Sequence, residues 1–357
     1  MNPAFWKGRQ VFLTGHTGFK GAWLALWLQK MGARVTAFSL EPPTQPSLFE
    51  TARVAQRITS IHGDIRDYDA LNATLRGSRA SIVFHLAAQA IVADGYRFAR
   101  DTFATNVTGT VNLLEALRDN PTVDAAVVVT SDKCYVPAPD GAPLLEGNPL
   151  GGKDPYSASK SCAEIATASW RESFFNTEDS PRIAAARAGN VIGGGDWAAH
   201  RLLPDLVRAF AAGQAPMLRM PGAIRPWQHV LDALSGYLLL AEHLCGKDGA
   251  CLARAWNFGP ADADHLTVGE VAAHCADLWG DGARIEVAAA NFQKETETLR
   301  LDATQARETL GWHPRWSADD ALRRALDWYR AWYSQPGDTA RMRAITLAQI
   351  DDYTSIP

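Results

Sequence analysis

A tyrosine and a lysine stand four positions apart, at Tyr156 and Lys160, in a stretch with the pattern of a helix. This spacing places both side chains on one face of a helix. An ammonium group beside a phenol favours the phenolate, so we expect Lys160 to lower the tyrosine pKa from about 10. The pair could then remove a proton from a hydroxyl group. Taken alone, it is also what an exposed helix face would carry.

A hydroxyl, a carboxyl and an amine follow one another at Ser131, Asp132 and Lys133, directly after the apolar run of residues 126–129. The run predicts a buried strand, and side chains at the carboxyl end of a parallel strand face the ligand crevice. We therefore expect a hydroxyl, a carboxyl and an amine at the rim of that crevice. A plain turn with a solvated aspartate and lysine is the alternative for this segment alone.

Three glycines, Gly15, Gly18 and Gly21, occur in the stretch T-G-H-T-G-F-K-G between a predicted strand and a predicted helix. A tight turn there needs φ values that glycine adopts cheaply, and missing side chains let backbone N–H groups approach a pyrophosphate. In this strand–turn–helix context the triplet predicts a dinucleotide site. A nicotinamide held there could take hydride while the phenolate takes the proton.

The choice between NAD and NADP depends on the end of the second strand. An acidic ribose ligand is expected about 20 residues after the glycine turn, and Glu41 lies there. No Arg or Lys occurs between residues 36 and 46 to meet a 2′-phosphate. NAD is therefore favoured, although Glu41 reads equally well as a solvated loop carboxylate.

Short apolar runs alternate with longer helical patterns through the first half of the chain. The runs are residues 11–14, 34–39, 58–62, 82–86, 126–131 and 183–187. The helical patterns cover residues 22–31, 67–75, 102–118 and 156–175. This alternation predicts an α/β fold with a doubly wound, parallel Rossmann sheet.

The alternation loosens after Gly189. Residues 255–259 look like one more strand, and the chain is mixed and mostly helical from His265 onward. We expect an NAD-binding Rossmann domain at 1–187, to which 226–258 returns. Residues 188–225 and 259–357 would form a smaller, mixed C-terminal substrate lobe, with a cleft between the two.

Composition excludes several classes of protein. The formal charge of −4 over 357 residues argues against a nucleic-acid or acidic-membrane binder. No apolar run approaches the ~18 residues of a membrane span, and residues 1–10 lack a signal core. The five cysteines form no C-x-x-C pair, so we expect no metal site and no disulfide framework. A cytoplasmic enzyme is the expectation.

Several motifs together resemble the CDP-glucose 4,6-dehydratases of the extended short-chain dehydrogenase/reductase (NAD-dependent epimerase/dehydratase) family. Besides the glycine turn they are H-L-A-A-Q at 85–89, T-S-D-K-C-Y at 130–135, D-P-Y-S-A-S-K at 154–160, R-A-G-N-V-I-G-G-G-D-W at 187–197, I-R-P-W-Q-H-V-L at 224–231, W-N-F-G-P at 256–260 and L-G-W-H-P-R-W at 310–316. The resemblance covers nearly the whole chain. The Ser-Asp-Lys trio is its most telling part, because related dTDP-sugar dehydratases carry Thr-Asp-Glu there.

The resemblance implies roles for the catalytic residues. Tyr156 would deprotonate the 4-hydroxyl of the sugar while tightly bound NAD takes hydride from carbon 4, and Ser131 would hydrogen-bond the carbon 4 oxygen. Asp132 would be the acid for the departing hydroxyl on carbon 6, and Lys133, or a water it positions, the base at carbon 5. Return of hydride to carbon 6 would give a 4-keto-6-deoxy sugar.

The resemblance also implies binding residues and partners. Those for the cofactor are Gly15, Gly18, Phe19, Gly21, Asp64, Ile65, Ala87, Ala88, Asn106, Thr130, Tyr156 and Lys160. Those for the substrate are Asn190, Arg225 and His229. A homodimer through the helices at 102–118 and 156–175, and a place in deoxysugar biosynthesis such as that of lipopolysaccharide O-antigen, are further implications.

The chain departs from the family near the expected sugar site. Ala93 and Gly95 stand where the family supplies an arginine and a serine, and residues 136–141 lack the usual aromatic, charged stretch. A usual histidine is also missing near Lys294 and Glu295. These differences leave three hypotheses open: a sugar-nucleotide 4,6-dehydratase, a 4-epimerase or other NAD-retaining sugar-nucleotide enzyme, and a cofactor-binding module without turnover. The first is favoured, because an epimerase needs the Tyr/Lys pair but no acid–base couple for elimination.

Overall fold

The computed structural model describes residues 1–288 and 298–356. Lys294 and Glu295, and with them the missing histidine, lie outside the described residues. Within the described part of the chain, no helix is both long and apolar enough to cross a bilayer.

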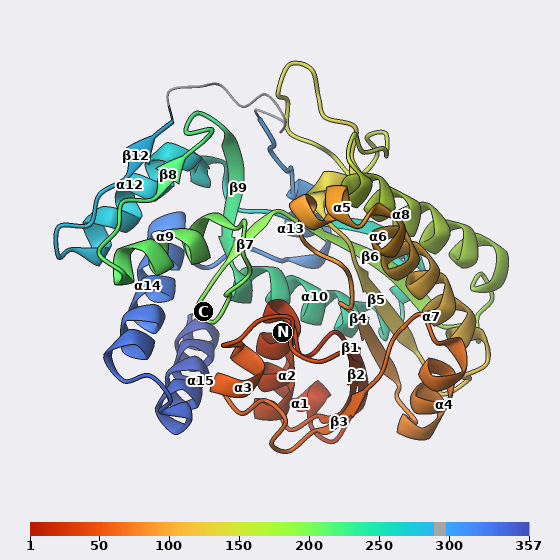
Figure 1. Cartoon of the computed structure of the whole chain (residues 1–357). Helices are drawn as coiled ribbons and strands as arrows, with labels where there is room; N and C mark the ends of the chain where they lie inside the picture. The colour runs from red at the N-terminus through yellow and green to blue at the C-terminus, as the bar shows by residue number, and fades with distance from the viewer. Residues whose placement is uncertain (289–297, 357) are drawn as a thin grey trace.

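A seven-stranded sheet with every neighbouring pair parallel forms the centre of the larger lobe (Figure 1). Its order is β10-β6-β5-β4-β1-β2-β3. The strands are β1 (Gln10–Thr14), β2 (Arg34–Ser39), β3 (Thr59–His62), β4 (Ile82–His85), β5 (Ala125–Val129), β6 (Arg182–Ala188) and β10 (Ala255–Phe258). β4 and β5 are buried along their whole length, as strands covered on both faces must be. The doubly wound Rossmann sheet expected from the sequence is confirmed.

Helices cover both faces of this sheet. On one face lie α2 (Phe19–Lys30) and α10 (Val230–Leu244), together with α1 (Pro3–Trp6) and α3 (Leu48–Thr51). On the other lie α4 (Tyr68–Ser78), α5 (Val92–Arg97), α6 (Ala99–Phe103), η1 (Ala104–Thr108), α7 (Gly109–Arg118) and α8 (Pro155–Phe174). The helix expected at 102–118 is thus three segments, with a π-helical turn at η1. Such turns are frequent at functional sites.

The smaller lobe is built on short strands. β7 (Asn190–Ile192), β9 (Ile224–His229) and β11 (His265–Thr267) form a mixed sheet, and β8 (Met217–Leu218) pairs with β12 (Glu286–Val287). Around them pack α9 (Leu202–Ala211), α12 (Val268–Trp279), α13 (Thr304–Leu310), α14 (Ala318–Ser334) and α15 (Thr339–Ser355). The remaining short elements are η2 (Asp132–Cys134), α11 (Gly249–Leu252) and η3 (Asp262–Asp264). β9 pairs with β7 and β11, and α10, which follows it directly, packs against β5 and β6 of the large sheet.

The carboxyl group of Asp232 ties the end of the chain to the larger lobe. Its Oδ1 accepts hydrogen bonds from the Tyr353 hydroxyl at 2.8 Å and from the Arg315 backbone N–H at 2.7 Å. The Trp312 indole donates to Ser235, one turn along α10, at 2.9 Å. Burial raises the pKa of Asp232 to about 7. The W-H-P-R-W motif thus serves to anchor α15.

Candidate active site

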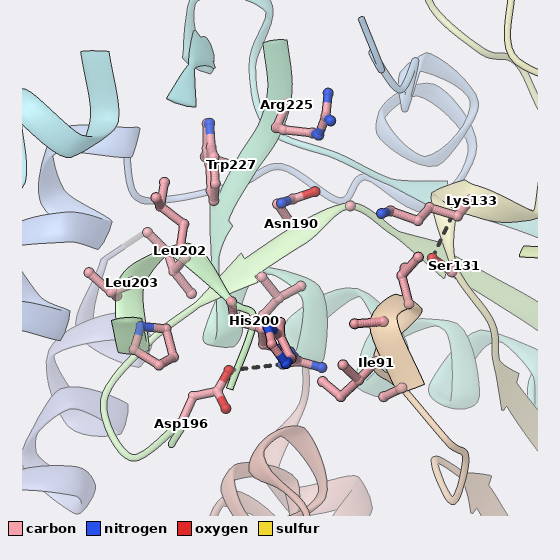
Figure 2. A pocket seen from close by; sticks show the side chains of 18 of the residues that line it. Ile91, Ser131, Lys133, Asn190, Asp196, His200, Leu202, Leu203, Arg225 and Trp227 are labelled. Atoms are coloured by element: carbon pink, nitrogen blue, oxygen red, sulfur yellow. Dashed lines mark hydrogen bonds and ion pairs between the residues drawn. The ribbon is translucent and has the colours of Figure 1, made fainter. Parts of the chain in front are cut away.

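A cavity of about 570 Å³ lies between the carboxyl ends of the large sheet and the smaller lobe. Figure 2 shows Ser131, Lys133 and Ile91 on one side of it, and Asn190, Asp196 and Arg225 on the other. Its volume is in the range of small-molecule sites. The polar and charged side chains that line it include Lys20, Ser131, Asp132, Lys133, Tyr156, Lys160, Asn190, Asp196, His200, Arg201, Arg219 and Arg225. The structure therefore brings together the five residues predicted to be catalytic.

Ser131, Asp132 and Lys133 follow the end of β5 and line this cavity. Ser131 caps η2, accepting the backbone N–H of Lys133 at 3.2 Å and donating to Asp132 Oδ1 at 3.0 Å. The Asp132 carboxyl is 2% exposed, and its Oδ2 makes no hydrogen bond to any described residue. Burial raises the pKa of Asp132, against the opposing effects of Lys133 and the Ser131 hydrogen bond. A carboxyl held in this way retains its proton more readily than a solvated one.

Tyr156 and Lys160 come from the first turns of α8, which Asp154 caps by accepting the Ser157 N–H at 3.0 Å. Burial raises the pKa of Tyr156 to about 12, while a hydrogen bond with Ser131 acts in the opposite direction. For the protein by itself, the expectation of a lowered Tyr156 pKa is therefore wrong. Desolvation of the phenolate outweighs the favourable contacts. Burial likewise lowers the pKa of Lys160 to about 8.

A buried ion pair supports this helix face from behind. Arg187 donates to both carboxylate oxygens of Glu164, at 2.9 and 2.8 Å, and to the Tyr135 hydroxyl at 2.6 Å. Thr130, predicted to line the cofactor, also donates to Glu164. The charge of Glu164 raises the pKa of Lys160 against the effect of burial. The sequence analysis missed Glu164, although its position four residues after Lys160 puts it on the same helix face.

The glycine turn has the geometry of a phosphate cradle. Gly15 takes φ +82°, and a Cβ there would lie 2.6 Å from the backbone N of Ala87. A Cβ on Gly21 would lie 2.1 Å from the Gly15 carbonyl oxygen. At Gly18, the N-cap of α2, the nearest atom to an added Cβ is that same oxygen, at 3.5 Å. Gly15 and Gly21 are thus required by the turn itself, whereas Gly18 leaves open space, which fits a pyrophosphate against the helix N-terminus.

The other residues predicted to bind the cofactor differ in whether they line the cavity and in their hydrogen-bond partners. Ala88 lines the cavity with Thr130, Tyr156 and Lys160, whereas Phe19, Ile65 and Ala87 do not. Asp64 is paired with Arg66, whose hydrogen bond lowers the Asp64 pKa. Asn106, in the π-helical turn, is 2% exposed and donates to Ser159 at 2.9 Å and to the Gln89 carbonyl at 3.0 Å. Asn106 thus holds α8 and the 85–89 loop together.

Glu41 lies at the end of β2, where the ribose ligand was expected. Its carboxylate is 75% exposed and forms an ion pair with His62 at 2.5 Å, between Oε1 and Nδ1. The end of β2 also holds Ser39, whose hydroxyl is 2.7 Å from that of Thr17. The exposed Glu41–His62 pair agrees both with a ribose ligand and with a solvated loop carboxylate.

Asn190 and Arg225, predicted to face the substrate, line the cavity, but His229 does not. The His229 ring is fully buried between Trp23 and Trp316, and its Nδ1 accepts the Leu231 N–H at 3.2 Å. His229 therefore caps α10, and burial lowers its pKa to about 3. The assignment of His229 to the substrate site is corrected here.

Three cationic side chains in the cavity, Lys20, Arg201 and Arg219, were not singled out from the sequence. Lys20 lies inside the T-G-H-T-G-F-K-G motif, and its pKa is lowered to about 7 by burial and by the charge of Lys160. Arg201, in the stretch before α9, donates to Asp196 Oδ2 at 2.9 Å. The motif signalled Lys20, but nothing in the local sequence marks Arg201 as part of the site.

The sequence profile described as GDP-mannose 4,6 dehydratase matches residues 12–325. A CDP-glucose 4,6-dehydratase from Salmonella typhimurium is 46% identical over 355 residues, 98% of each chain. A UDP-glucose 4-epimerase from Halalkalibacterium halodurans is 24% identical and covers 90% of this chain and 95% of its own length.

Solved structures agree on the fold. DesIV, a dTDP-glucose 4,6-dehydratase from Streptomyces venezuelae solved with NAD and TYD bound, superposes with a TM-score of 0.78 at 23% identity. The alignment covers 92% of this chain and 99% of that one. A UDP-glucose 4-epimerase from Stenotrophomonas maltophila gives 0.79 at 22% identity, with 91% and 99% covered. At these identities the likeness concerns the fold alone.

Proposed function

Because this chain belongs to the GDP-mannose 4,6-dehydratase family, within the extended short-chain dehydrogenases/reductases, we propose that it converts CDP-D-glucose to CDP-4-dehydro-6-deoxy-D-glucose. The protein is a dehydratase, a carbon–oxygen lyase that uses NAD. The relative from Salmonella supports CDP-glucose as the substrate, since the similarity extends over the full length of both chains.

One observation separates this proposal from a 4-epimerase on the same fold. An epimerase needs only the Tyr/Lys pair, yet the cavity also holds Asp132 and Lys133 beside Tyr156. A buried carboxyl with an unpartnered oxygen is suited to give a proton to a leaving hydroxyl. A cofactor-binding module without turnover would not need these groups either.

The residues fit NAD. The open face of Gly18, with the turn that Gly15 and Gly21 close, would hold the pyrophosphate, and Ala88, Tyr156 and Lys160 would line the nicotinamide end. When bound, NAD would accept hydride from sugar carbon 4 and return it to carbon 6. The cycle consumes no net cofactor.

The side chains then divide the proton transfers among them. Tyr156 takes the proton of the 4-hydroxyl, with Lys160 supplying positive charge and Ser131 a hydrogen bond to the carbon 4 oxygen. Lys133, or a water that it positions, takes the proton from carbon 5 and returns one there when hydride reaches carbon 6. Asp132 gives its proton to the 6-hydroxyl, which leaves as water. Asn190 and Arg225 hold the nucleotide end of the substrate.

The two lobes share this work. We assign the cofactor to the Rossmann part, residues 1–187 with 226–258, and the nucleotide sugar to residues 188–225 and 259–357. The cavity supports this division, because it lies where the ends of β4 and β5 meet β7, β9 and α9.

The proposed reaction is tested by incubating the purified protein with CDP-glucose, without added cofactor, and following the product by mass spectrometry. We expect the loss of one water per sugar and the release of NAD(H) when the protein is denatured. An isomer of unchanged mass would support an epimerase instead. Release of NADP would contradict the cofactor assignment.

We also propose a homodimer through α6, α7 and α8. α6 carries the exposed apolar side chain Phe103 and α8 carries Ile165 and Phe174, and such side chains gather at interfaces between subunits. Sedimentation should give twice the chain mass, and Ile165→Glu should give the monomer. Met217→Glu, at an exposed methionine of the smaller lobe, is the matched control and should leave the dimer intact.

We further propose that the protein acts in the cytoplasm. We also propose that its product supplies a deoxysugar pathway, such as that of the O-antigen. Both extend the expectations drawn from the sequence. Cell fractionation tests the first. Analysis of surface polysaccharide sugars after deletion of the gene tests the second.

A further inference from the structure

One buried ion pair holds both ends of the segment 131–133, which carries the acid and the base of the elimination. Thr130, directly before this segment, donates its hydroxyl proton to Glu164. Tyr135, two residues after it, accepts a hydrogen bond at its hydroxyl oxygen from Arg187 Nη1 at 2.6 Å. Glu164 and Arg187 are joined by two hydrogen bonds, at 2.9 and 2.8 Å, and each is 3% exposed. The ion pair therefore fixes where this segment starts and where it ends.

The same ion pair belongs to the helix that carries Tyr156 and Lys160. Glu164 stands one helical turn beyond Lys160 in α8, which packs against β6 (Figure 1). Lys160 Nζ donates to the Val129 carbonyl at 3.3 Å, and the next residue of the chain, Thr130, donates to Glu164. Two contacts from one helix face thus fasten this helix to the end of β5, and they bring a carboxylate close to the lysine.

Lys160 is surrounded by groups that do little to balance its charge. Burial lowers the pKa of Lys160 to about 8, and its hydrogen-bond acceptor, a carbonyl, is neutral. The other titratable groups around it are Tyr156 on α8, Asp132 and Cys134 on η2, His85 on β4, Lys20 on α2 and, beyond Glu164, Arg187 on β6. Burial favours the neutral forms of the phenol, the carboxyl, the thiol and the imidazole, and the other two side chains are basic. Glu164 is therefore the anion best placed to hold the proton on Lys160.

We propose that Glu164 is a positioning residue, which keeps Lys160 protonated beside Tyr156 and fastens their helix to the end of β5. Arg187 limits how much of the glutamate charge reaches the lysine, because it binds the same carboxylate. This inference rests on the proposed function, since a charged Lys160 matters only if Tyr156 must lose its proton to act as the base.

The test follows the protonation of Lys160 itself, without turnover. In protein made with isotope-labelled lysine, the NMR signal of the Lys160 Cε moves as the ammonium loses its proton, and Lys160→Met identifies that signal by its absence. Glu164→Gln should lower the pH at which Lys160 titrates by about one unit or more, because the nearby negative charge is gone. An unchanged midpoint would overturn the proposal.

A second variant separates this effect of charge from mere loosening of the site. Arg187→Gln breaks the same ion pair but leaves Glu164 in place, so the midpoint of Lys160 should rise, whereas loosening alone would move both variants in one direction. Tyr135→Phe is the matched control, because it removes another hydrogen bond of Arg187 without changing any charge. It should leave the midpoint as in the parent. Midpoints that fall in both Glu164→Gln and Arg187→Gln would contradict the proposal.

Each of these single variants strands a buried charge, which can prevent folding. The double variant Glu164→Gln, Arg187→Gln removes both charges and keeps two amides that can hydrogen-bond to one another. Its Lys160 midpoint should lie below that of the parent, and an equal midpoint would count against the proposal. Glu164→Asp keeps the charge in a shorter side chain and should bring the midpoint back towards the parent value.

The consequence for catalysis is measured as the pH dependence of product formation. Lys160 must carry its proton, so turnover should fall as the pH rises through the lysine pKa. In Glu164→Gln this fall should begin at a lower pH, by the same shift that the lysine signal shows. A uniform loss at every pH would indicate a structural role only and would overturn the proposal. The lysine signal is recorded without CDP-glucose, so a parent protein that releases no water from CDP-glucose refutes the proposed function separately.

Discussion

Burial shifts the pKa values of the side chains that must move protons. Desolvation raises the pKa of both Tyr156 and Asp132, and at Asp132 it acts against the charges of Lys133, Arg225 and Lys20. A neutral carboxyl is ready to act as an acid, whereas a neutral phenol must be helped to act as a base. Lys160 and the cationic nicotinamide ring would supply that help.

Replacing Tyr156 by phenylalanine should remove the base while sparing the cofactor. We expect turnover to fall by ~10²–10⁴-fold, as is typical for loss of a general base. Product formation followed by mass spectrometry measures it. Tyr353→Phe is a matched control, because it removes another buried phenol hydroxyl, bonded to Asp232 at 2.8 Å, far from the cavity. A Tyr156→Phe enzyme as fast as this control would refute the assignment.

Asp132→Asn should separate oxidation from elimination. The amide cannot give a proton to the departing hydroxyl, so the reaction should stop after hydride has left carbon 4. NADH absorbance should then rise after addition of CDP-glucose to the NAD-loaded variant, and it should persist. Formation of the 4-keto-6-deoxy product at the parent rate would identify another residue as the acid.

Local spacing explains which site residues the sequence could predict. Tyr156 and Lys160 share a helix face, and Ser131, Asp132 and Lys133 follow one strand, so two local rules were enough to bring them together. Arg201 reaches the cavity only because the smaller lobe packs against the strand ends. The sequence assigned His229 to the substrate because its motif is local. Packing of the two lobes instead buries its ring in the core.

At the scale of the elements, the glycine turn before α2 offers a test that separates folding from cofactor binding. Gly18→Ala adds a methyl group into space that no described atom fills, so the protein should fold and melt like the parent without cofactor. Its affinity for NAD should fall about tenfold or more, because the methyl group meets the pyrophosphate.

The control for this prediction is Gly21→Ala, whose Cβ would lie 2.1 Å from a backbone oxygen of the same turn. Here the turn itself must shift, so both the melting temperature and NAD affinity should fall. Thermal melting with and without NAD measures both effects, since a ligand that binds only the folded state raises the melting temperature. Unchanged NAD binding in Gly18→Ala would argue against the proposed cradle.

Strands were easier to predict than helix ends. The run at 34–39 coincides with β2, and the other runs of the large sheet differ by one or two residues at their ends. The helix at 102–118 was predicted as continuous, because its apolar periodicity does not register the π-helical turn at Ala104–Thr108. Within that turn Asn106 donates to Gln89 and Ser159, whose positions along the chain local periodicity does not reveal.

At the scale of the whole molecule, the buried carboxyl of Asp232 links stability to pH. Its folded pKa of about 7 lies above the ordinary aspartate value of 3.8. A raised folded pKa means that the stabilisation is complete below about pH 4 and is lost as the pH rises through 7. The loss is on the order of 4 kcal/mol when Asp232 is fully ionised.

Asp232→Asn cannot ionise but keeps the Oδ1 acceptor for Tyr353 and Arg315. Relative to the parent, the variant should therefore gain stability between pH 5 and pH 8 by a few kcal/mol. Urea unfolding at the two pH values measures this difference. Parallel pH dependences for parent and variant would show that Asp232 is already ionised in the folded protein below pH 5, and would contradict its raised pKa.

The order of strands in the large sheet has a consequence for synthesis on the ribosome. β10 (Ala255–Phe258) pairs with β6 (Arg182–Ala188), so the sheet lacks its last strand until more than sixty further residues have been translated. During that interval the nascent chain presents β6 as an open edge, which can pair with other chains. α10, made shortly before β10, brings apolar cover to the adjacent strands first. Translation that pauses before residue 255 would therefore leave the chain most dependent on chaperones.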